Sequence, residues 1–581
     1  MKNLFAIWYF FDSFQKKKAI SLFVLGLVCI IFETVGIGSI LPLVKILLSE
    51  NLIENNFFQN YFLFLSSLSY SNLIKLFLLL ISIIFFLKFM LLVLFNYYTE
   101  KFCNNLIETF STKLLNKYLL NNYDFFVKKN TGEFLRDIDA AKSISSLWRQ
   151  YTILVTEILL LIFVTSLLIY VDVYTTLFVV LFILSISSIY YLIFKKKLKI
   201  FGEKKLQLSS QIHKSLLQSF GGIKMIKLSS LEEFFTKIYE NFLIRFNKIE
   251  IFSKIILFIP RYFLEILAIF AMCLIVSWKV TYEIPNTEII ATLALFGFAG
   301  FKIIPAASKI LNSLSSIKYA LPASELVLYE LRKTEKSLNF LKKKDVKKYN
   351  FGINEISLHG ISFRYSNNPN DIFDDLNLTL RKGTIYGIVG NSGTGKSTLL
   401  DIILGLLKIT NGSIIVNDKN LQSVLYYFQS KCGYVAQNTY LMDESIRQNI
   451  IFGKFYSDQN AINKRLDSVI NLCNLKDFIN SLPEGVDTVV GDRGSRLSIG
   501  QIQRIGLARA LYHDPEVLIL DEFTSALDPE SEKDILNNIK VVSQNKIVIL
   551  SSHKSKPLEY CDKIFQINNK KLLPLKFNEK F

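Results

Sequence analysis

Histidine is scarce in this sequence and closely spaced cysteines are absent, although these residues are common metal ligands and cysteines form disulfides. Its 581 residues include four His and six Cys, and no two Cys form a Cys-x-x-Cys pair. Several of the Cys lie within apolar runs, where a thiol usually packs as a small buried hydrophobic group. The sequence therefore predicts neither a disulfide framework nor a Cys-based metal site, and it favours a reducing compartment.

Acidic residues are fewer than basic ones, and the formal net charge is +18. The basic residues gather beside apolar runs. Lys16–Lys18 precede the first run, Lys195–Lys197 follow the fourth, and the loop from Glu50 to Ser71 has no Lys or Arg. This asymmetry is typical of membrane proteins whose basic flanks stay in the cytoplasm. We therefore predict a cytoplasmic N-terminus and no nucleic-acid partner.

Six apolar stretches are long enough to cross a bilayer core, which needs about 20 helical residues. They lie at about 19–48, 72–98, 150–171, 174–196, 251–280 and 286–312. The first is too long for the apolar core of a signal peptide, so no cleavable leader is expected. The connections at 99–147 and 197–248 are long, polar and rich in helix formers. We predict that they are helices that extend into the cytoplasm.

A short external segment and a soluble domain complete the predicted organisation. Residues 51–71 carry aromatic residues at helical spacing, which fits a helix on the membrane surface or a helical extension packed against its neighbours. The predicted domains are a six-helix membrane domain at 1–320, a charged linker at 321–352, and a soluble domain at 353–581 that opens on the alternating strand ISLHGISFRY.

A glycine-rich loop in the soluble domain has the pattern G-x-x-x-x-G-K-[ST]. It follows the apolar strand TIYGIV and precedes the helical run LLDIILGLL, which is the context that a phosphate-binding loop requires. Its glycines allow backbone N–H groups to surround phosphate, while Lys396 reaches the β/γ-phosphates and Ser397 coordinates Mg²⁺. The predicted ATP-binding residues here are Gly390, Asn391, Ser392, Gly393, Thr394, Gly395, Lys396, Ser397 and Thr398.

A buried strand, VLILDE, supplies two carboxylates to the same predicted site. Asp521 stands at its end, where it can hold Mg²⁺, and Glu522 follows, where it can polarise an attacking water. An ordinary pair of carboxylates at a strand end is the alternative. The nearby phosphate loop favours the catalytic interpretation.

The block LSIGQIQRIGLARALYHDPEVLILDEFTSALD resembles the signature-to-D-loop region of ATP-binding-cassette (ABC) domains. Ile499 stands where that family has the central Gly of its signature. The resemblance implies a type IV ABC exporter: a six-helix α-helical membrane domain followed by an α/β P-loop nucleotide-binding domain. It also implies that two chains enclose two ATP molecules, so a homodimer is expected. The residues it adds are Tyr365 against adenine, Gln437 as a catalytic and Mg²⁺-sensing residue, His553 as a catalytic switch, and Ser498, Gly500, Gln501 and Asp528 at ATP.

The membrane half resembles bacterial lipid-linked oligosaccharide flippases in FETVGIGSILPLVKILLS, IPRYFLEI and FKIIPAASKIL. This resemblance implies an anionic, polyprenyl-diphosphate-linked substrate that meets membrane lipid and cationic side chains within the bacterial inner membrane. The candidates are Lys88, Arg261, Lys302 and Lys309, with Glu33, Glu157 and Glu265 as possible partners. An exporter of lipid A, drugs or peptides is the alternative. A cassette ATPase that moves nothing is disfavoured by its complete catalytic set.

Overall fold

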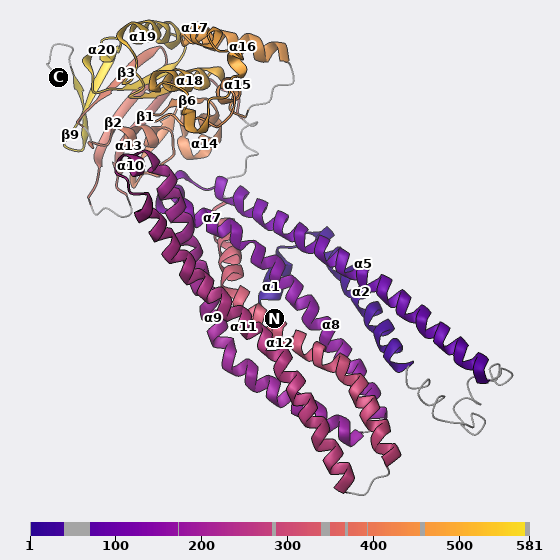
Figure 1. Cartoon of the computed structure of the whole chain (residues 1–581). Helices are drawn as coiled ribbons and strands as arrows, with labels where there is room; N and C mark the ends of the chain where they lie inside the picture. The colour runs from indigo at the N-terminus through magenta and orange to yellow at the C-terminus, as the bar shows by residue number, and fades with distance from the viewer. Residues whose placement is uncertain are drawn as a thin grey trace. The chain divides into compact units, whose positions relative to one another are not determined.

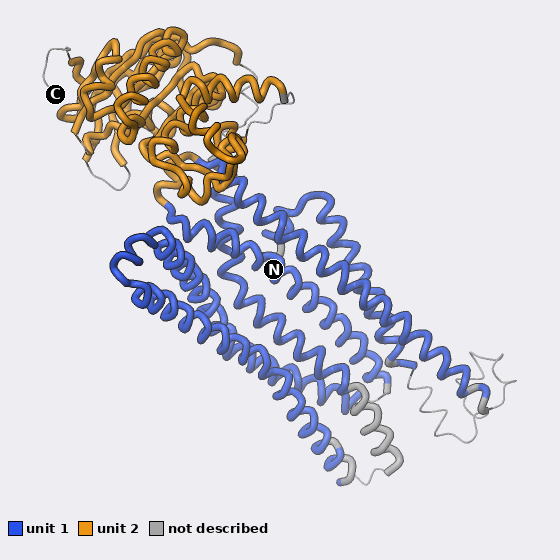
Figure 2. The backbone as a smooth tube through the Cα atoms, turned by 45° about the horizontal axis from the view of Figure 1, so that its top comes forward, with its two compact units in different colours: residues 1–121, 129–338 blue, residues 122–128, 339–581 orange. Residues whose placement is uncertain are grey.

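The computed structural model describes residues 2–39, 70–171, 173–281, 286–338, 349–365, 370–391, 393–453 and 459–575. The chain forms two compact units, one of residues 1–121 and 129–338 and the other of residues 122–128 and 339–581 (Figure 2). Residues 51–69 of the predicted external segment lie outside the described residues. The short segment 122–128 comes from the first half of the sequence but belongs to the second unit.

The first unit is built from long helices (Figure 1). Five segments of the described helices are long and apolar enough to cross a membrane: Ser13–Gly36, Ile74–Leu119, Thr131–Tyr170, Val173–Gly221 and Glu232–Trp278. The sixth predicted span, 286–312, lies within the continuous helix α12. The helices are α1 (Lys2–Tyr9), α2 (Ser13–Gly38), α5 (Tyr70–Leu119), α7 (Thr131–Ala140), α8 (Lys142–Val171), α9 (Val173–Gly221), α10 (Ile223–Leu228), α11 (Glu232–Thr281) and α12 (Asn286–Leu338).

The long helices continue beyond the apolar spans without a break. Helix α5 has 50 residues and contains neither Gly nor Pro, so nothing in its sequence ends it at the edge of the span. At 1.5 Å per residue it is about 75 Å long, more than twice a bilayer core. Helices α9 and α11 have 49 and 50 residues and extend in the same way. The predicted helical character of the long connections is confirmed.

The predicted linker begins too early in the sequence. Residues 321–338 are the last turns of α12 and belong to the first unit. Val327, Leu328 and Leu331 are at most 4% exposed, so this charged stretch has one buried apolar face. Burial of this apolar face stabilises the helical conformation of the stretch. The face was not recognised in the sequence because charged residues surround it.

The second unit contains two sheets. One is antiparallel with strand order β2-β1-β4-β5, and the other has the order β10-β9-β3-β8-β7-β6 and is parallel apart from β10. The strands are β1 (Glu355–Phe363), β2 (Phe373–Arg381), β3 (Thr384–Val389), β4 (Asn411–Val416), β5 (Lys419–Asn420), β6 (Cys432–Val435), β7 (Val517–Asp521), β8 (Ile547–Ser551), β9 (Lys563–Asn568) and β10 (Lys571–Leu575). Because β3, β7 and β8 run parallel, their carboxyl ends meet at one edge.

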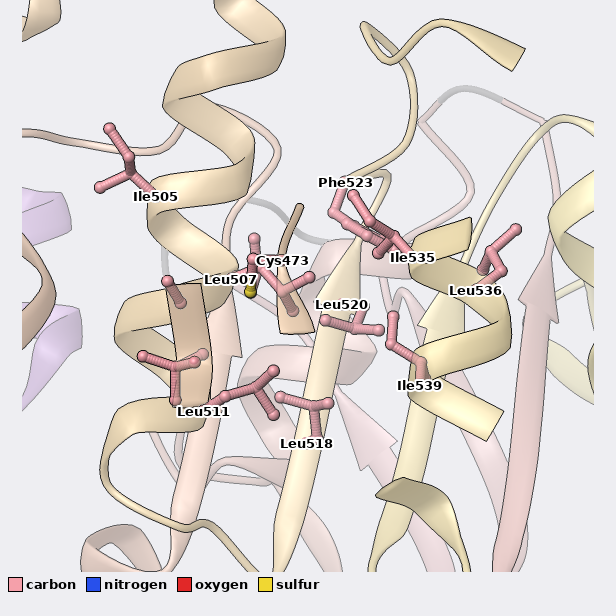
Figure 3. Close-up of a cluster of buried hydrophobic side chains, with 14 of the residues drawn as sticks. Cys473, Ile505, Leu507, Leu511, Leu518, Leu520, Phe523, Ile535, Leu536 and Ile539 are labelled. Atoms are coloured by element: carbon pink, nitrogen blue, oxygen red, sulfur yellow. The ribbon is translucent and has the colours of Figure 1, made fainter. Parts of the chain in front are cut away.

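Helices cover the parallel sheet and complete its core. Leu518 and Leu520 of β7 are buried together with Leu511 of α18 and Ile535 and Ile539 of α19 (Figure 3). All five residues of β7 are buried, and its first four are apolar, as is typical of a strand covered on both faces. The helices of this unit are α6 (Tyr123–Lys128), α13 (Lys396–Ile403), α14 (Leu421–Ser430), α15 (Ile446–Ile451), α16 (Gln459–Leu472), α17 (Lys476–Asn480), α18 (Ile499–Tyr512), α19 (Pro529–Ser543) and α20 (Ser555–Leu558).

A buried charge network joins three helices of the first unit. Asp137 of α7 is fully buried and accepts hydrogen bonds from the Tyr118 hydroxyl at 2.9 Å and from Lys129 Nζ at 2.5 Å. Arg136 binds the other carboxylate oxygen through two nitrogens, at 2.7 and 2.8 Å. Lys129 also lies 3.2 Å from Glu330 of α12. Lys129 is the first residue after the segment 122–128. Its ion pairs with α7 and α12 therefore anchor the start of this part of the first unit.

We expect Asp137→Ala to lower the free energy of unfolding by about 3–5 kcal/mol, because it removes one partner of a buried ion pair. The matched control is Asp139→Ala on the same helix. Asp139 is half exposed and pairs with Lys142 at 3.0 Å, so its loss is expected to cost about 0–1 kcal/mol. Unfolding of the detergent-solubilised protein by heat or denaturant measures both. Equal destabilisation by the two variants would contradict a structural role for the network.

Candidate nucleotide site and membrane cavities

The loop between β3 and α13 takes a conformation that requires glycine. Gly393 and Gly395 have φ angles of +82° and +102°, in the left-handed region that side chains disfavour. A Cβ at Gly395 would also lie 2.8 Å from Ile372 Cγ2, and one at Gly390 would lie 2.6 Å from Thr394 Oγ1. The loop therefore curls tightly at the start of α13, as a phosphate cradle does. Ser392 lies outside the described residues.

The ammonium group of Lys396 lies inside this curled loop. Its side chain is buried, and Nζ donates to the carbonyl oxygens of Gly390 at 2.8 Å and Asn391 at 3.3 Å. Nζ also lies 3.6 Å from a carboxylate oxygen of Glu522. A buried cation held among backbone groups at a helix N-terminus suits the charge of a triphosphate.

Oxygen atoms suited to Mg²⁺ come together beside the loop. The Ser397 hydroxyl donates to Asp521 Oδ2 at 2.9 Å, and the Ser551 hydroxyl donates to Asp521 Oδ1 at 2.5 Å. Asp521 is 3% exposed at the end of β7. Mg²⁺ usually binds through one or two carboxylates together with phosphate oxygens. The predicted pair of Ser397 and Asp521 therefore fits this ion.

Glu522 follows Asp521 in a strained backbone conformation. Its φ angle is +46°, which costs a non-glycine residue about 1–3 kcal/mol. Its N–H group donates to the carbonyl oxygen and hydroxyl of Ser551, at 3.2 and 3.1 Å. The carboxylate accepts a hydrogen bond from Gln437 Nε2 at 2.7 Å and lies 3.6 Å from His553 Nδ1. All three predicted catalytic residues thus meet at one carboxylate.

An aspartate and two tyrosines within electrostatic range of Asp521 or of each other are not distinguished by any sequence motif. Burial and the negative charge of Asp521 raise the pKa of Asp401, on α13, to about 6. Burial, with Asp521 and Asp401 nearby, also raises the pKa of the Tyr434 phenol on β6. Tyr123 of α6 has a raised pKa because of burial and the proximity of Asp401. The segment 122–128 therefore lies within electrostatic range of the nucleotide site in its own unit.

The predicted adenine-stacking residue, Tyr365, lies at the end of β1. Its hydroxyl hydrogen-bonds to the Thr398 hydroxyl at 3.2 Å, and its ring stands edge-on to that of Phe363, with centroids 5.0 Å apart. One side chain thus links β1 to the first turn of α13. Stacking on adenine stays a prediction.

The signature residues form the N-terminus of α18. Ser498 and Gln501 make a reciprocal capping box, with N–H···O distances of 3.2 and 2.9 Å. Ile499, in place of glycine, is 67% exposed, and a Cβ at Gly500 would lie 3.0 Å from the Ala526 carbonyl oxygen. Among the described residues, no hydrogen bond or ion pair links this signature to the phosphate loop. Asp528 likewise caps its own helix, α19, and the Ser531 N–H group lowers its pKa.

The four cationic candidates in the membrane half all have carboxylate partners. Glu33 lies 3.1 Å from Lys88 and 2.7 Å from Lys302, so two ammonium groups share one carboxylate. The other two pairs are Lys309 with Glu157, at 2.5 Å, and Arg261 with Glu265, at 3.2 Å. The expectation that the acidic residues serve as partners is confirmed. The two latter pairs are electrically neutral, so only the Glu33 cluster keeps an unbalanced positive charge.

Two cavities of the first unit bring these charges together. A cavity of about 590 Å³ is lined by Glu33, Glu157, Lys302 and Lys309. A second, of about 820 Å³, is lined by Arg261, Glu265 and Lys309 among mostly apolar side chains, including those of Phe258, Met272 and Phe301. Lys309 lines both cavities. Lys88 lines neither cavity and reaches the first only through Glu33.

Two family models match separate regions of the chain. Residues 27–300 match a family model described as the ABC transporter transmembrane region. Residues 373–525 match a model described as ABC transporter. The two matches follow each other in the order predicted from the sequence, so a multi-pass membrane region is followed by an ATP-binding domain.

Curated relatives and a solved structure agree with these matches. A protein of Staphylococcus aureus strain bovine RF122, provisionally named for multidrug export ATP-binding/permease activity, is 36% identical over 215 residues, or 37% of this chain and 36% of that protein. Its counterpart in strain N315 has the same identity and coverage. The match thus spans little more than a third of these relatives. The structure of a bacterial Atm1-family ABC exporter with ATP bound aligns with a TM-score of 0.78 at 18% identity, covering 96% of this chain and 95% of that one.

Proposed function

Since this chain belongs to the ABC transporters, with a transmembrane region followed by an ATP-binding domain, we propose that it couples ATP hydrolysis to export across a membrane. The proposal rests on the three side chains that surround the carboxylate of Glu522. Gln437, His553 and Lys396 all lie within 3.6 Å of its carboxylate, next to the Ser397–Asp521 pair. This arrangement suits in-line attack of water on a γ-phosphate.

Each residue has a distinct part in the proposed hydrolysis. The phosphate loop and Lys396 would hold the β- and γ-phosphates, and Ser397 and Asp521 would hold Mg²⁺, which when bound would offset phosphate charge. Glu522 accepts a hydrogen bond from the attacking water and polarises it, while Gln437 and His553 fix the carboxylate in place. Such positioned groups act mainly by electrostatic stabilisation in a site already organised for the transition state.

A second copy of the chain would complete each site. The signature of α18 is at a helix N-terminus, which favours binding of an anion. In this chain Ser498 and Gln501 cap their own helix, Gly500 lies against Ala526, and Ile499 is exposed. A partner's nucleotide would meet Ser498 and Gly500 there. The basic flanks of the apolar runs favour a bacterial inner-membrane location, with the N-terminus and nucleotide-binding domain in the cytoplasm.

The exported molecule is proposed to be an amphipathic anion of the polyprenyl-diphosphate oligosaccharide class. The Glu33 cluster holds two lysines and one carboxylate, with Lys88 7% exposed, so one positive charge is unbalanced in a buried place. A charge within a bilayer is costly, and an anionic headgroup would offset that cost by charge-assisted hydrogen bonds. The apolar wall of the larger cavity would suit a lipid chain.

We expect the double variant Arg261→Gln/Lys302→Gln to slow flipping of a polyprenyl-diphosphate glycan by roughly tenfold or more, because a hydrogen bond to a charged group contributes about 1.5–3 kcal/mol. Basal ATP hydrolysis should persist, since both residues lie in the other unit. Lys75→Gln, an exposed cation of α5 that lines neither cavity, is the control. Flipping at the wild-type rate in the double variant would refute an anionic cargo.

Export of drugs is the second candidate, favoured by the neutral ion pairs and the mostly apolar lining of the larger cavity. The relatives in Staphylococcus aureus carry names that refer to multidrug export. The same proteoliposomes decide between the two cargo classes. Stimulation of ATP hydrolysis by neutral drugs, without stimulation by diphosphate glycans, would favour this candidate and leave ATP-driven export intact.

A further inference from the structure

A groove between α9 and α11 gathers positive charge outside the two cavities. The two helices pack along each other in the first unit (Figure 1). The groove has a volume of about 360 Å³ and is lined by Lys204 from α9 and by Arg245 and Lys248 from α11. Gln207 and Gln211 add amide groups, and Phe201 forms part of an apolar floor. No carboxylate is among the residues that line it.

The three groove cations have no acidic partner among the described residues. Within the described part of the chain, no carboxylate forms an ion pair with Lys204, Arg245 or Lys248, although all three are exposed. Three other lysines of the same two helices do have partners. Lys199 pairs with Glu203 at 3.8 Å, and Lys205 and Lys254 pair with Glu250 at 3.7 and 3.5 Å. Lys195, Lys196, Lys197 and Lys214 of α9 likewise form no ion pair with a carboxylate of the described residues, so the groove is one of two or more places where these helices carry unpaired positive charge, and it is the one where both helices contribute cations to a common lining.

The position of the groove along its helices corresponds to the level of lipid headgroups. Lys248 lies three residues before the apolar span of α11, or about 4.5 Å along the helix axis, and Arg245 about 9 Å. On α9, Phe201 lies five residues beyond the end of the apolar run at 196, or about 7.5 Å, and Lys204 lies eight residues beyond it, or about 12 Å. Each headgroup layer is roughly 5–8 Å thick, and Lys and Arg side chains extend several ångströms toward it. The groove thus opens where phosphates of the membrane surface are within reach.

We propose that this groove binds the phosphate headgroup of an anionic lipid in the leaflet at which α9 and α11 leave the membrane. Basic pockets between helices at this level suit such headgroups. The planar Arg245 guanidinium can bind two phosphate oxygens at once, and the two lysines add point charges from either side. The bound lipid would link α9 to α11 at the membrane boundary. The proposal does not depend on what is exported.

Native mass spectrometry of the full chain in detergent, with added phosphatidylglycerol or phosphatidylcholine, tests this binding directly. In the groove variant, Lys204→Gln/Arg245→Gln/Lys248→Gln, the affinity for phosphatidylglycerol should fall by at least about tenfold. The matched control is Lys199→Gln/Lys205→Gln/Lys254→Gln, which loses the same charge from the same helices. It should change the affinity by less than about twofold, because those lysines already have partners. Phosphatidylcholine binding should be the same in all three proteins.

Two further results distinguish a lipid site from general charge attraction and from a site for a soluble anion. An equal fall in the affinity for phosphatidylglycerol in both triple variants would show that total charge alone attracts the lipid. That result would overturn the proposal. Displacement of the lipid by millimolar inorganic phosphate would assign the groove to a soluble anion and would also overturn it. The single variant Arg245→Lys, which keeps the charge, should bind more weakly than wild type if two phosphate oxygens are held at once.

Discussion

Replacing Glu522 with Gln is expected to lower steady-state ATP hydrolysis by about 10²–10⁴-fold, the usual contribution of a positioned general base. The amide keeps the shape of the side chain but cannot polarise water as a carboxylate does. The phosphate loop and Lys396 are unchanged, so ATP should still bind. The left-handed backbone of Glu522 and its bonds to Ser551 aim the side chain into the site, which is why the effect should be large.

Phosphate release measures the turnover of this variant, and binding of a fluorescent ATP analogue measures its affinity. Glu530→Gln is the control, because Glu530 is an exposed carboxylate of the same domain, in the first turn of α19. It should hydrolyse ATP at the wild-type rate. Hydrolysis within a few-fold of wild type in Glu522→Gln would remove Glu522 from the proposed role.

Mixed dimers of Lys396→Ala and Ser498→Arg should reveal which chain contributes to which site. Lys396→Ala removes the cation of the phosphate loop, and Ser498→Arg obstructs the signature that faces the partner's nucleotide. If sites are shared between chains, one defect in each chain places both defects in the same site and leaves the other intact. If both defects are in one chain and the partner is wild type, each site has one defect. The first dimer should hydrolyse ATP and the second should be nearly inactive.

Sites formed within single chains would give the reverse order of activities, because the second dimer would then keep one wild-type site. The two dimers contain the same substitutions in the same number, so differences in stability largely cancel between them. Co-expression with two affinity tags and sequential purification isolates each dimer. Higher activity in the dimer that carries both defects in one chain would contradict shared sites.

The grouping of the candidate nucleotide-site residues was predictable because their proposed chemistry depends on short spacings along the chain. The phosphate loop needs its glycines and Lys396 within a few residues, and Asp521 and Glu522 follow directly from an apolar strand. Parallel strands then bring these two segments to one edge. Contacts between distant segments could not be predicted in this way. Neither the sharing of Glu33 by two lysines nor the grouping of Tyr123 with the second unit has a local signal.

The predicted linker is a second case in which contacts with distant segments, not local composition, decide the structure. Its charged composition predicted a linker at 321–352, yet residues 321–338 continue α12, because three apolar residues there are buried against the first unit. Burial depends on the neighbouring helices, which composition alone does not describe. Residues 51–69 of the predicted external segment lie outside the described residues, so the interpretation of that segment stays a prediction.

The most direct test of ATP-driven export is lipid movement in proteoliposomes that contain only this chain. A fluorescent polyprenyl-diphosphate oligosaccharide is incorporated, and the fraction accessible from one side is followed with and without ATP and Mg²⁺. The account predicts movement in one direction that requires ATP and stops in the Glu522→Gln variant. Movement at the same rate without ATP, or in that variant, would contradict it.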